Sequence, residues 1–252
     1  MNFVDPYTFR ARVQPALIVV LPAGFLLFAL LPDHPFFVAA FFGLLGAAGG
    51  TSIVAQVGRD RGLRKQSDLW KSWGGPPTTR LLRHRRQPGD PELSPGLRRQ
   101  VEEWTGYSLP TEQEEEACPS QADEKYEEVV KSLLEATRDR DRFPLVFAEV
   151  VNYGFRRNLW GLRPIGAPTA VALASFSWAL LVLTVWGRPW PDPWWDIIPN
   201  PDSVAVIRLA VAIADTGLAA FWVFWVKKSW VKTVADVYAS RLVESVQTLR
   251  SS

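Results

Sequence analysis

Two charged residues, Arg208 and Asp215, lie inside an otherwise apolar stretch of the chain, where a charge needs a specific reason. The stretch runs from Val204 to Val226 and is long enough to cross a membrane as a helix. A charged side chain at the centre of a bilayer costs about 2.5 to 3.5 kcal/mol on insertion scales, so it normally faces protein or water. We therefore expect Asp215 to line a water-filled path or to hydrogen-bond a hydroxyl of another span, the candidates being Thr51, Ser52, Ser175 and Ser177.

Three roles for Asp215 stay open at this point: a polar contact that holds spans together, a pore or ion pathway, and proton coupling. Arg208 lies seven residues earlier, on the same helix face. Seven residues of helix rise about 10 Å, so we do not expect a direct ion pair between the two side chains.

Motifs of known enzyme chemistry do not occur in this sequence. The chain has two histidines and one cysteine, and it contains no HExxH, CxxC, GxGxxG, GxxxxGK[ST] or GxSxG pattern. This disfavours zinc, dinucleotide, P-loop and nucleophile-elbow chemistry. We predict no catalytic residue, no metal and no cofactor, and hence a protein that is not an enzyme. A membrane-bound enzyme that uses carboxylates is the less favoured alternative, because 26 acidic residues always include some pair.

The chain has four apolar blocks, at about 13–31, 36–57, 167–186 and 204–226, and Arg208 and Asp215 lie in the fourth. The segments 32–35 and 188–202 that join them in pairs are short or rich in proline, so each pair forms an antiparallel hairpin. Tryptophans gather at both ends of the second hairpin, as in the aromatic belts of membrane proteins. The predicted fold is therefore an all-α polytopic membrane protein with four transmembrane helices in two hairpins.

The basic residues predict the orientation of these spans. Of 28 lysines and arginines, 26 lie before the first span, between the second and third, or after the fourth. The positive-inside rule therefore places both termini and the central segment in the cytoplasm. Basic residues close to the span ends should contact anionic lipid headgroups or phosphates: Arg59, Arg61, Arg64, Lys65, Arg156, Arg157, Lys227 and Lys228.

Small residues at a spacing of four suggest where the spans pack closely. Gly46 and Gly50 form a GxxxG pair in the second block, and Ala210 and Ala214 have the same spacing in the fourth. Contacts within one chain are the favoured interpretation, and a homo-oligomer interface is the alternative.

Between the two hairpins, residues 58–163 have the pattern of a folded helical module. Ser94, Pro95 and Gly106 are typical of the start and end of a short helix. Tyr126, Val129 and Leu133 lie on one face of an amphipathic helix, and another helix is predicted from Pro144 to about Leu159. The domain boundaries that follow are 1–57 for hairpin 1, 58–163 for the module, 164–226 for hairpin 2, and 227–252 for a C-terminal cytoplasmic helix that continues the fourth span.

Parts of the module are harder to interpret. The segment 74–91 is rich in glycine, proline and arginine and gives no clear prediction of structure. Its basic run around His84 could hold phosphates, a nucleotide or anionic lipid, and lipid is the favoured interpretation. The acidic segment 110–122 is expected to be an exposed connector or a helix start. Trp70, Trp73 and Trp104 could stack on bases, but their spacing is more typical of a core or an interface, so nucleic acid is not an expected partner.

Two segments of the chain resemble a group of uncharacterised bacterial four-span membrane proteins. They are Ser72-Trp-Gly-Gly-Pro-Pro-Thr-Thr79 with Leu81-Leu-Arg-His-Arg85, and Arg142-Phe-Pro-Leu-Val-Phe147 through Asn152-Tyr-Gly-Phe-Arg-Arg-Asn158. The resemblance covers most of the chain and implies a bacterial inner membrane, without any activity or catalytic residue. The layout is also similar to that of multi-span effectors in bacterial defence systems.

The leading hypothesis is a non-enzymatic membrane protein whose cytoplasmic module senses a soluble partner or small signal and acts on the transmembrane unit. The second hypothesis is a membrane scaffold that docks a soluble partner and conducts nothing. Signal-dependent permeability of the membrane separates the two. The expected partners are membrane lipids, a second copy of the chain, and a soluble protein or small signal.

Overall fold

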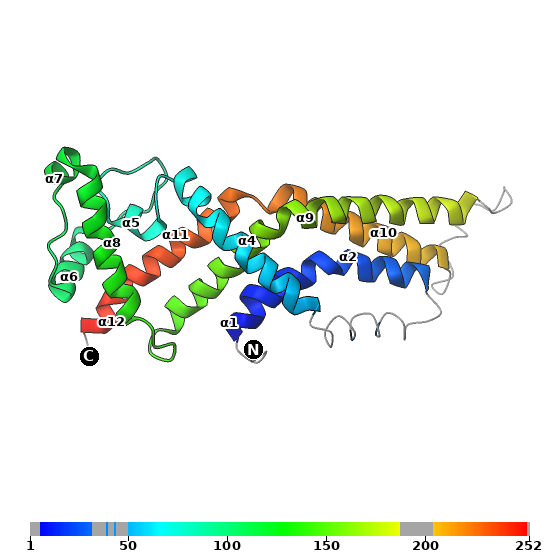
Figure 1. Ribbon diagram of the computed structural model, residues 1–252, viewed down its shortest axis with the longest axis horizontal. Helices are drawn as coiled ribbons and strands as arrows, with labels where there is room; N and C mark the ends of the chain where they lie inside the picture. Colours follow the sequence, from blue (N-terminus) through cyan, green and yellow to red (C-terminus); the bar gives the residue numbers. More distant parts are fainter. Residues whose placement is uncertain (1–5, 32–38, 40–42, 44–49, 187–203, 251–252) are drawn as a thin grey trace. The chain divides into compact units, whose positions relative to one another are not determined.

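The computed structural model of this chain describes residues 6–31, 39, 43, 50–186 and 204–250 (Figure 1). Helices are the only regular elements in these ranges, and the described part of the chain contains no strand. The all-α prediction is therefore confirmed. Most of the predicted second span, including Gly46, lies outside the described residues.

The chain divides into two compact units, each assembled from two separate stretches of sequence. Unit 1 consists of residues 1–63 and 157–227, and unit 2 of residues 64–156 and 228–252. The boundaries fall within two long helices, α4 (Gly50–Ser72) and α9 (Pro144–Trp186), and just after the last helix of unit 1. The division predicted from the sequence, after residues 57, 163 and 226, stays a prediction.

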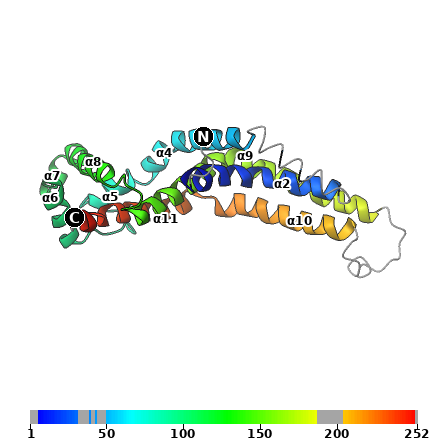
Figure 2. The same cartoon turned by 90° about the horizontal axis from the view of Figure 1, so that it is seen from below.

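Unit 1 contains the helices that are apolar enough to cross a membrane. These are Phe9–Leu30, which joins η1 (Phe9–Val13) to α2 (Gln14–Leu30); the long helix α9; and Val204–Trp225, which joins α10 (Val204–Ala220) to η3 (Phe221–Trp225). A short helix, α1 (Pro6–Thr8), precedes them. Helices α2 and α10 lie side by side in Figures 1 and 2. Three helices of the described chain are thus candidate membrane spans by length and composition.

Large apolar side chains remain exposed on these helices, which fits a lipid environment. Leu183 is 72% exposed, Phe224 68% and Trp225 63%. Large apolar side chains that are this exposed on several helices are unfavourable in water and fit contact with lipid or another protein. The exposure is compatible with a membrane location for unit 1.

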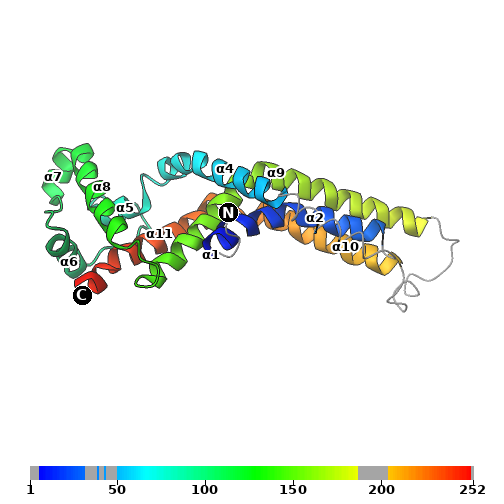
Figure 3. The same ribbon diagram turned by 60° about the horizontal axis from the view of Figure 1, so that its bottom comes forward.

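Unit 2 is a bundle of short helices around one apolar core. Its elements are α5 (Pro77–Leu82), α6 (Pro95–Thr105), α7 (Glu112–Ala117), α8 (Pro119–Ala136), the start of α9, α11 (Lys228–Glu244) and α12 (Val246–Arg250). Helix α5 packs against both α8 and α11 (Figure 3). The buried core takes residues from every one of these helices except α7, among them Leu82, Val101, Tyr126, Leu133, Val146, Leu242 and Val246.

Local signals in the sequence predicted the two ends of α6 and the buried face of α8. The Ser94 side chain accepts a hydrogen bond from the Leu97 N–H at 3.3 Å, and Gly106 takes a left-handed φ of 72° at the end of α6. In α8, Tyr126, Val129 and Leu133 are all buried. These are the capping and amphipathic patterns expected from the residues.

The predicted continuation of the fourth span into a cytoplasmic helix is wrong. The helix ends at Trp225, because the next residue, Val226, has a ψ of 86°, which is not a helical value. A new helix, α11, begins at Lys228. The helical periodicity of the following residues is real, but it belongs to a separate helix of unit 2, which ends before Ser245.

Candidate functional site

Asp215 is fully buried within unit 1, between α10 and α9. The Ser177 hydroxyl of α9 donates a hydrogen bond to Asp215 Oδ2 at 2.6 Å. This confirms one of the four expected partners; Ser175 instead donates to the Val171 carbonyl of its own helix. The second oxygen, Oδ1, is buried without a hydrogen-bond partner among the described residues. A buried carboxylate oxygen left in this way is unusual and calls for an explanation.

Arg208 makes its own contacts, separate from Asp215, as expected. Its Nε donates to the Ala29 carbonyl of α2 at 3.2 Å, and its Nη1 donates to the Thr184 hydroxyl of α9. Ala29 lies in the last turn of α2, where carbonyls lack partners within the helix. A cation at that end is also favoured by the helix dipole. Arg208 therefore joins three helices of unit 1.

The two polar contacts share one helix register. A step of seven residues back along α10, from Asp215 to Arg208, matches a step of seven forward along α9, from Ser177 to Thr184. The two helices are thus antiparallel. The buried alanines of α10 follow the same heptad spacing: Ala205, Ala212 and Ala219.

Of the residues predicted to pack closely, the structure describes the surroundings of Ala210 and Ala214 only. Ala210 is exposed and Ala214 half-buried, and of the predicted glycine pair only Gly50 is described, as the start of α4, without its surroundings. A tight approach within the described residues joins Gly161 of α9 to Gly62 of α4, where a Cβ at Gly161 would lie 2.5 Å from the Gly62 nitrogen. Gly58 and Gly62 are themselves a GxxxG pair, so the signal was present in the sequence.

Polar side chains of α9 hold the irregular turns of the neighbouring helices. Asn158 Nδ2 donates to the Ala11 carbonyl of η1 at 2.8 Å. Arg163 donates through Nε and Nη2 to the carbonyls of Trp222 and Val223 in η3, at 3.3 and 3.2 Å. Both receiving segments are π-helical, a geometry that disturbs the regular hydrogen-bond ladder. These contacts stabilise unit 1 and were not predicted.

The eight basic residues expected to contact lipid headgroups differ in how exposed their side chains are. Arg64, Lys227 and Lys228 are exposed, whereas Arg59, Arg61 and Lys65 are half-buried. In unit 2, Arg156 Nη1 donates to the Trp230 carbonyl at 2.9 Å, and its guanidinium lies over the Trp230 ring. Arg157 is only 9% exposed. The burial of Arg157 does not fit a contact with lipid headgroups.

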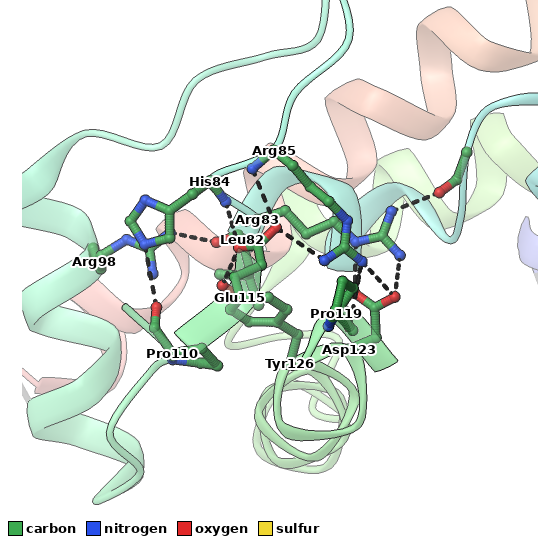
Figure 4. A network of polar contacts seen from close by, with 11 residues as sticks. Leu82, Arg83, His84, Arg85, Arg98, Pro110, Glu115, Pro119, Asp123 and Tyr126 are labelled. Atoms are coloured by element: carbon green, nitrogen blue, oxygen red, sulfur yellow. Dashed lines mark hydrogen bonds and ion pairs between the residues drawn. The ribbon is translucent and has the colours of Figure 1, made fainter. Parts of the chain in front are cut away.

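A network of polar contacts in unit 2 centres on Glu115, which is 2% exposed (Figure 4). Its Oε2 accepts the His84 N–H at 2.8 Å and the Tyr126 hydroxyl at 2.7 Å, and its Oε1 accepts the Arg85 N–H at 3.1 Å. The Arg85 guanidinium adds an ion pair at 3.2 Å. Glu115 therefore ties the segment after α5 to helices α7 and α8.

These contacts shift the pKa values of both buried groups. Burial alone would raise the pKa of Glu115. The hydrogen bonds from His84, Tyr126 and Arg85 outweigh burial and hold that pKa below its ordinary value. Burial, and then the bond to Glu115, raises the pKa of Tyr126 well above its ordinary value. Glu115 is therefore ionised and Tyr126 neutral at physiological pH.

The acidic segment that carries Glu115 was only partly understood from the sequence. It forms α7, which begins with a capping box in which Thr111 and Glu114 satisfy each other's backbone N–H groups. The Thr-x-x-Glu spacing could have predicted this helix start. The burial of Glu115 has no such local signal, because its partners come from distant segments.

A second charged cluster of unit 2 surrounds Arg80, which is 3% exposed. Its Nη1 donates to Asp236 of α11 at 3.1 Å, and its Nη2 pairs with Asp90. Lys232 lies 3.2 Å from Asp90 and 3.0 Å from Asp236. Burial would raise the pKa of Asp90, but the hydrogen bonds from Gln87, Arg80 and Lys232 lower it overall.

Comparisons of the chain with protein-family models, with curated proteins and with solved structures found no match. The function must therefore be argued from the residues of this chain.

Proposed function

We propose that this chain is a non-enzymatic, multi-pass protein of the bacterial inner membrane. In this proposal it has four spans in two hairpins, and unit 2 is a cytoplasmic module that senses a soluble partner or small signal and acts on the membrane unit as an effector or pore-like element. Both termini lie in the cytoplasm, in keeping with the distribution of basic residues. The exposed apolar side chains of unit 1 support its contact with lipid.

The proposal rests on the hydrogen bonding of the buried Asp215 carboxylate. Its carboxylate has one hydrogen bond, from Ser177, and one buried oxygen without a partner in the described ranges. A purely structural contact would be expected to satisfy both oxygens, because an unpaired polar atom in a low-dielectric interior is costly. A site that takes up water or an ion in a second conformation explains why the cost is tolerated.

Permeability of reconstituted liposomes tests this function. We expect the full-length protein to release a trapped ion or small dye, and Asp215→Asn to change that release. Ser177→Ala removes the hydrogen-bond partner that Asp215 has among the described residues, and it should also change the release. Ser175→Ala is the matched control, since Ser175 lies on the same helix but donates to its own backbone. Leakage that is identical in all four proteins would contradict a role of Asp215 in permeation.

The alternative function is a membrane scaffold that docks a soluble partner. Helix α8 supports it, because acidic side chains are exposed on the face opposite its buried stripe, namely Glu124, Glu127, Glu128 and Glu135. Tight liposomes in all four preparations, with the proteins shown to be inserted and folded, would favour the scaffold. A membrane-bound enzyme is the least supported candidate and would require turnover that a carboxylate substitution abolishes.

A further inference from the structure

Unit 2 has a small pocket of about 200 Å³ that is lined largely by arginines. The lining residues are Trp73, Gly74, Arg80, Arg83, Arg85, Arg86, Gln87 and Asp90. Asp90 is the one carboxylate among them. Four arginines thus line the pocket with one carboxylate, because Asp123, Asp236 and Glu92, which pair with them, lie outside the lining, and an anion is the ligand that complements such a lining.

The arginines are held in place by carboxylates that do not line the pocket. Arg83 binds Asp123 through Nε and Nη2, both at 2.7 Å, and Arg85 Nη2 lies 2.7 Å from the same carboxylate. Figure 4 shows Arg83 and Arg85 both reaching Asp123. Asp236 likewise fixes the buried Arg80. Anchoring of this kind presets the guanidinium positions, which lowers the entropy lost when a ligand binds.

Two consecutive glycines turn the backbone at the pocket, and the first of them, Gly74, lines it. Gly74 and Gly75 have φ values of 84° and 139°, which other residues rarely adopt. A Cβ at Gly75 would lie 2.9 Å from Arg83 Nη2, and one at Gly74 would lie 2.8 Å from Gln87 Nε2. The Gly74 carbonyl also accepts a hydrogen bond from Arg83 Nη1 at 2.5 Å. The backbone turn is therefore fitted closely around an arginine of the pocket.

Some donor capacity of these arginines is unused. Arg80 Nε is buried and has no hydrogen-bond partner in the part of the chain that the structure describes. Arg86 makes one ion pair, at 3.0 Å to Glu92, and its side chain is 37% exposed. A guanidinium has five N–H donors in a planar fork that matches phosphate oxygens. Arg86 in particular can bind an anion while it keeps its contact with Glu92.

We propose that this pocket binds the phosphate groups of a small phosphorylated anion. The volume corresponds to about six or seven water molecules, which suits one or two phosphate groups rather than a whole nucleotide. The inference rests on the proposed function in one respect: the anion would be the signal that unit 2 senses. The phosphate can come from a soluble compound or from a lipid headgroup.

Calorimetric titration of pyrophosphate into the full-length protein, in nanodiscs of zwitterionic lipid, tests the pocket. We expect saturable binding at one site per chain. Arg86→Gln should weaken it by about tenfold or more, because a hydrogen bond from a charged donor is lost. Arg241→Gln is the matched control: Arg241 is an exposed arginine of unit 2 that pairs with Glu244. It should leave the affinity within about twofold of the wild type.

The absence of saturable pyrophosphate binding, or an equal loss in both variants, would overturn the inference. Arg86 is partly exposed, so the variant is expected to fold, and circular dichroism checks this. Nanodiscs that contain phosphatidic acid identify the source: competition with pyrophosphate indicates a lipid headgroup, and unchanged affinity indicates a soluble anion. Binding without leakage would count against the proposed function alone, and leakage without binding against this inference alone.

Discussion

Replacing Glu115 with glutamine tests whether this one buried carboxylate organises unit 2. Glutamine keeps the shape of the side chain but turns one acceptor oxygen into an NH₂ donor. Oε2 faces the His84 N–H and Oε1 faces the Arg85 N–H, at 2.8 and 3.1 Å. Whichever way the amide turns, a donor therefore meets a backbone donor (Figure 4).

The expected cost is about 3 kcal/mol of local stability, because one hydrogen bond to a charged acceptor is lost and a buried N–H is left unpaired. We add nothing for the ion pair with Arg85, since that side chain is 38% exposed and solvent screens the interaction. If the amides exchange through local opening, a change of this size accelerates exchange by about 150-fold.

Hydrogen exchange measured by mass spectrometry on peptides covering 82–86 and 111–127 is the assay. Glu116→Gln is the control, because Glu116 is the exposed neighbour in the same helix. It should change exchange by no more than about threefold. Equal exchange in the two variants would refute the role assigned to Glu115.

Three further outcomes follow from the structure. Gly161→Ala should lower the stability of unit 1 in detergent by about 1–3 kcal/mol, because the new Cβ would overlap the backbone of α4. Gly217→Ala is the control, since its Cβ would meet open space and should leave stability unchanged. Equal melting temperatures of the two variants would contradict the close contact. Because the pKa of Glu115 is lower in the fold than its unfolded-state pKa of about 4.3, its ionised form stabilises unit 2 above that pH, and the stabilisation is lost in acid. Hydrogen exchange in 111–127, corrected for its intrinsic rate, should therefore be flat from about pH 8 to 6 and should rise as the pH falls below about 4.5. A flat profile in acid would exclude this linkage. Ser94→Ala should lower the protection of α6 from hydrogen exchange by about 0.5–2 kcal/mol, because the N-cap hydrogen bond is lost. Ser132→Ala is the control, since the Ser132 hydroxyl donates to the Glu128 carbonyl of its own helix. Unaltered protection of α6 in Ser94→Ala would show that the cap contributes nothing.

The elements that could be predicted from the sequence are those specified by nearby residues. Ser94, Pro95 and Gly106 determine both ends of α6 within one short segment. Helix α8 was recognised from its apolar stripe, although it begins at Pro119, earlier than that stripe. The apolar blocks of unit 1 were equally clear, because each is a continuous property of its own segment.

The features that were missed depend on distant partners. Glu115 is one of four glutamates in a short acidic run, and only its contacts with His84, Arg85 and Tyr126 distinguish it. The break at Val226 has no glycine or proline to mark it, so the helical periodicity on both sides suggested one helix.

Asp215 is an intermediate case. A hydroxyl partner was predicted from the cost of a charge in an apolar span, but its identity was not. The register of α9 against α10 selects Ser177 over Ser175, and a single sequence does not reveal a register.

The order in which the two units appear along the chain has a consequence for synthesis. Unit 2 begins at residue 64, but Ala239, Leu242, Val243 and Val246 of its core are translated only after the whole of unit 1. Until then the face of α5 that packs on α11 has no cover. A ribosome that stops early therefore leaves a chain with exposed apolar surface, which chaperones and proteases recognise. Residues 228–250 are thus needed to close the core of unit 2, which stays incomplete in any chain that stops before them.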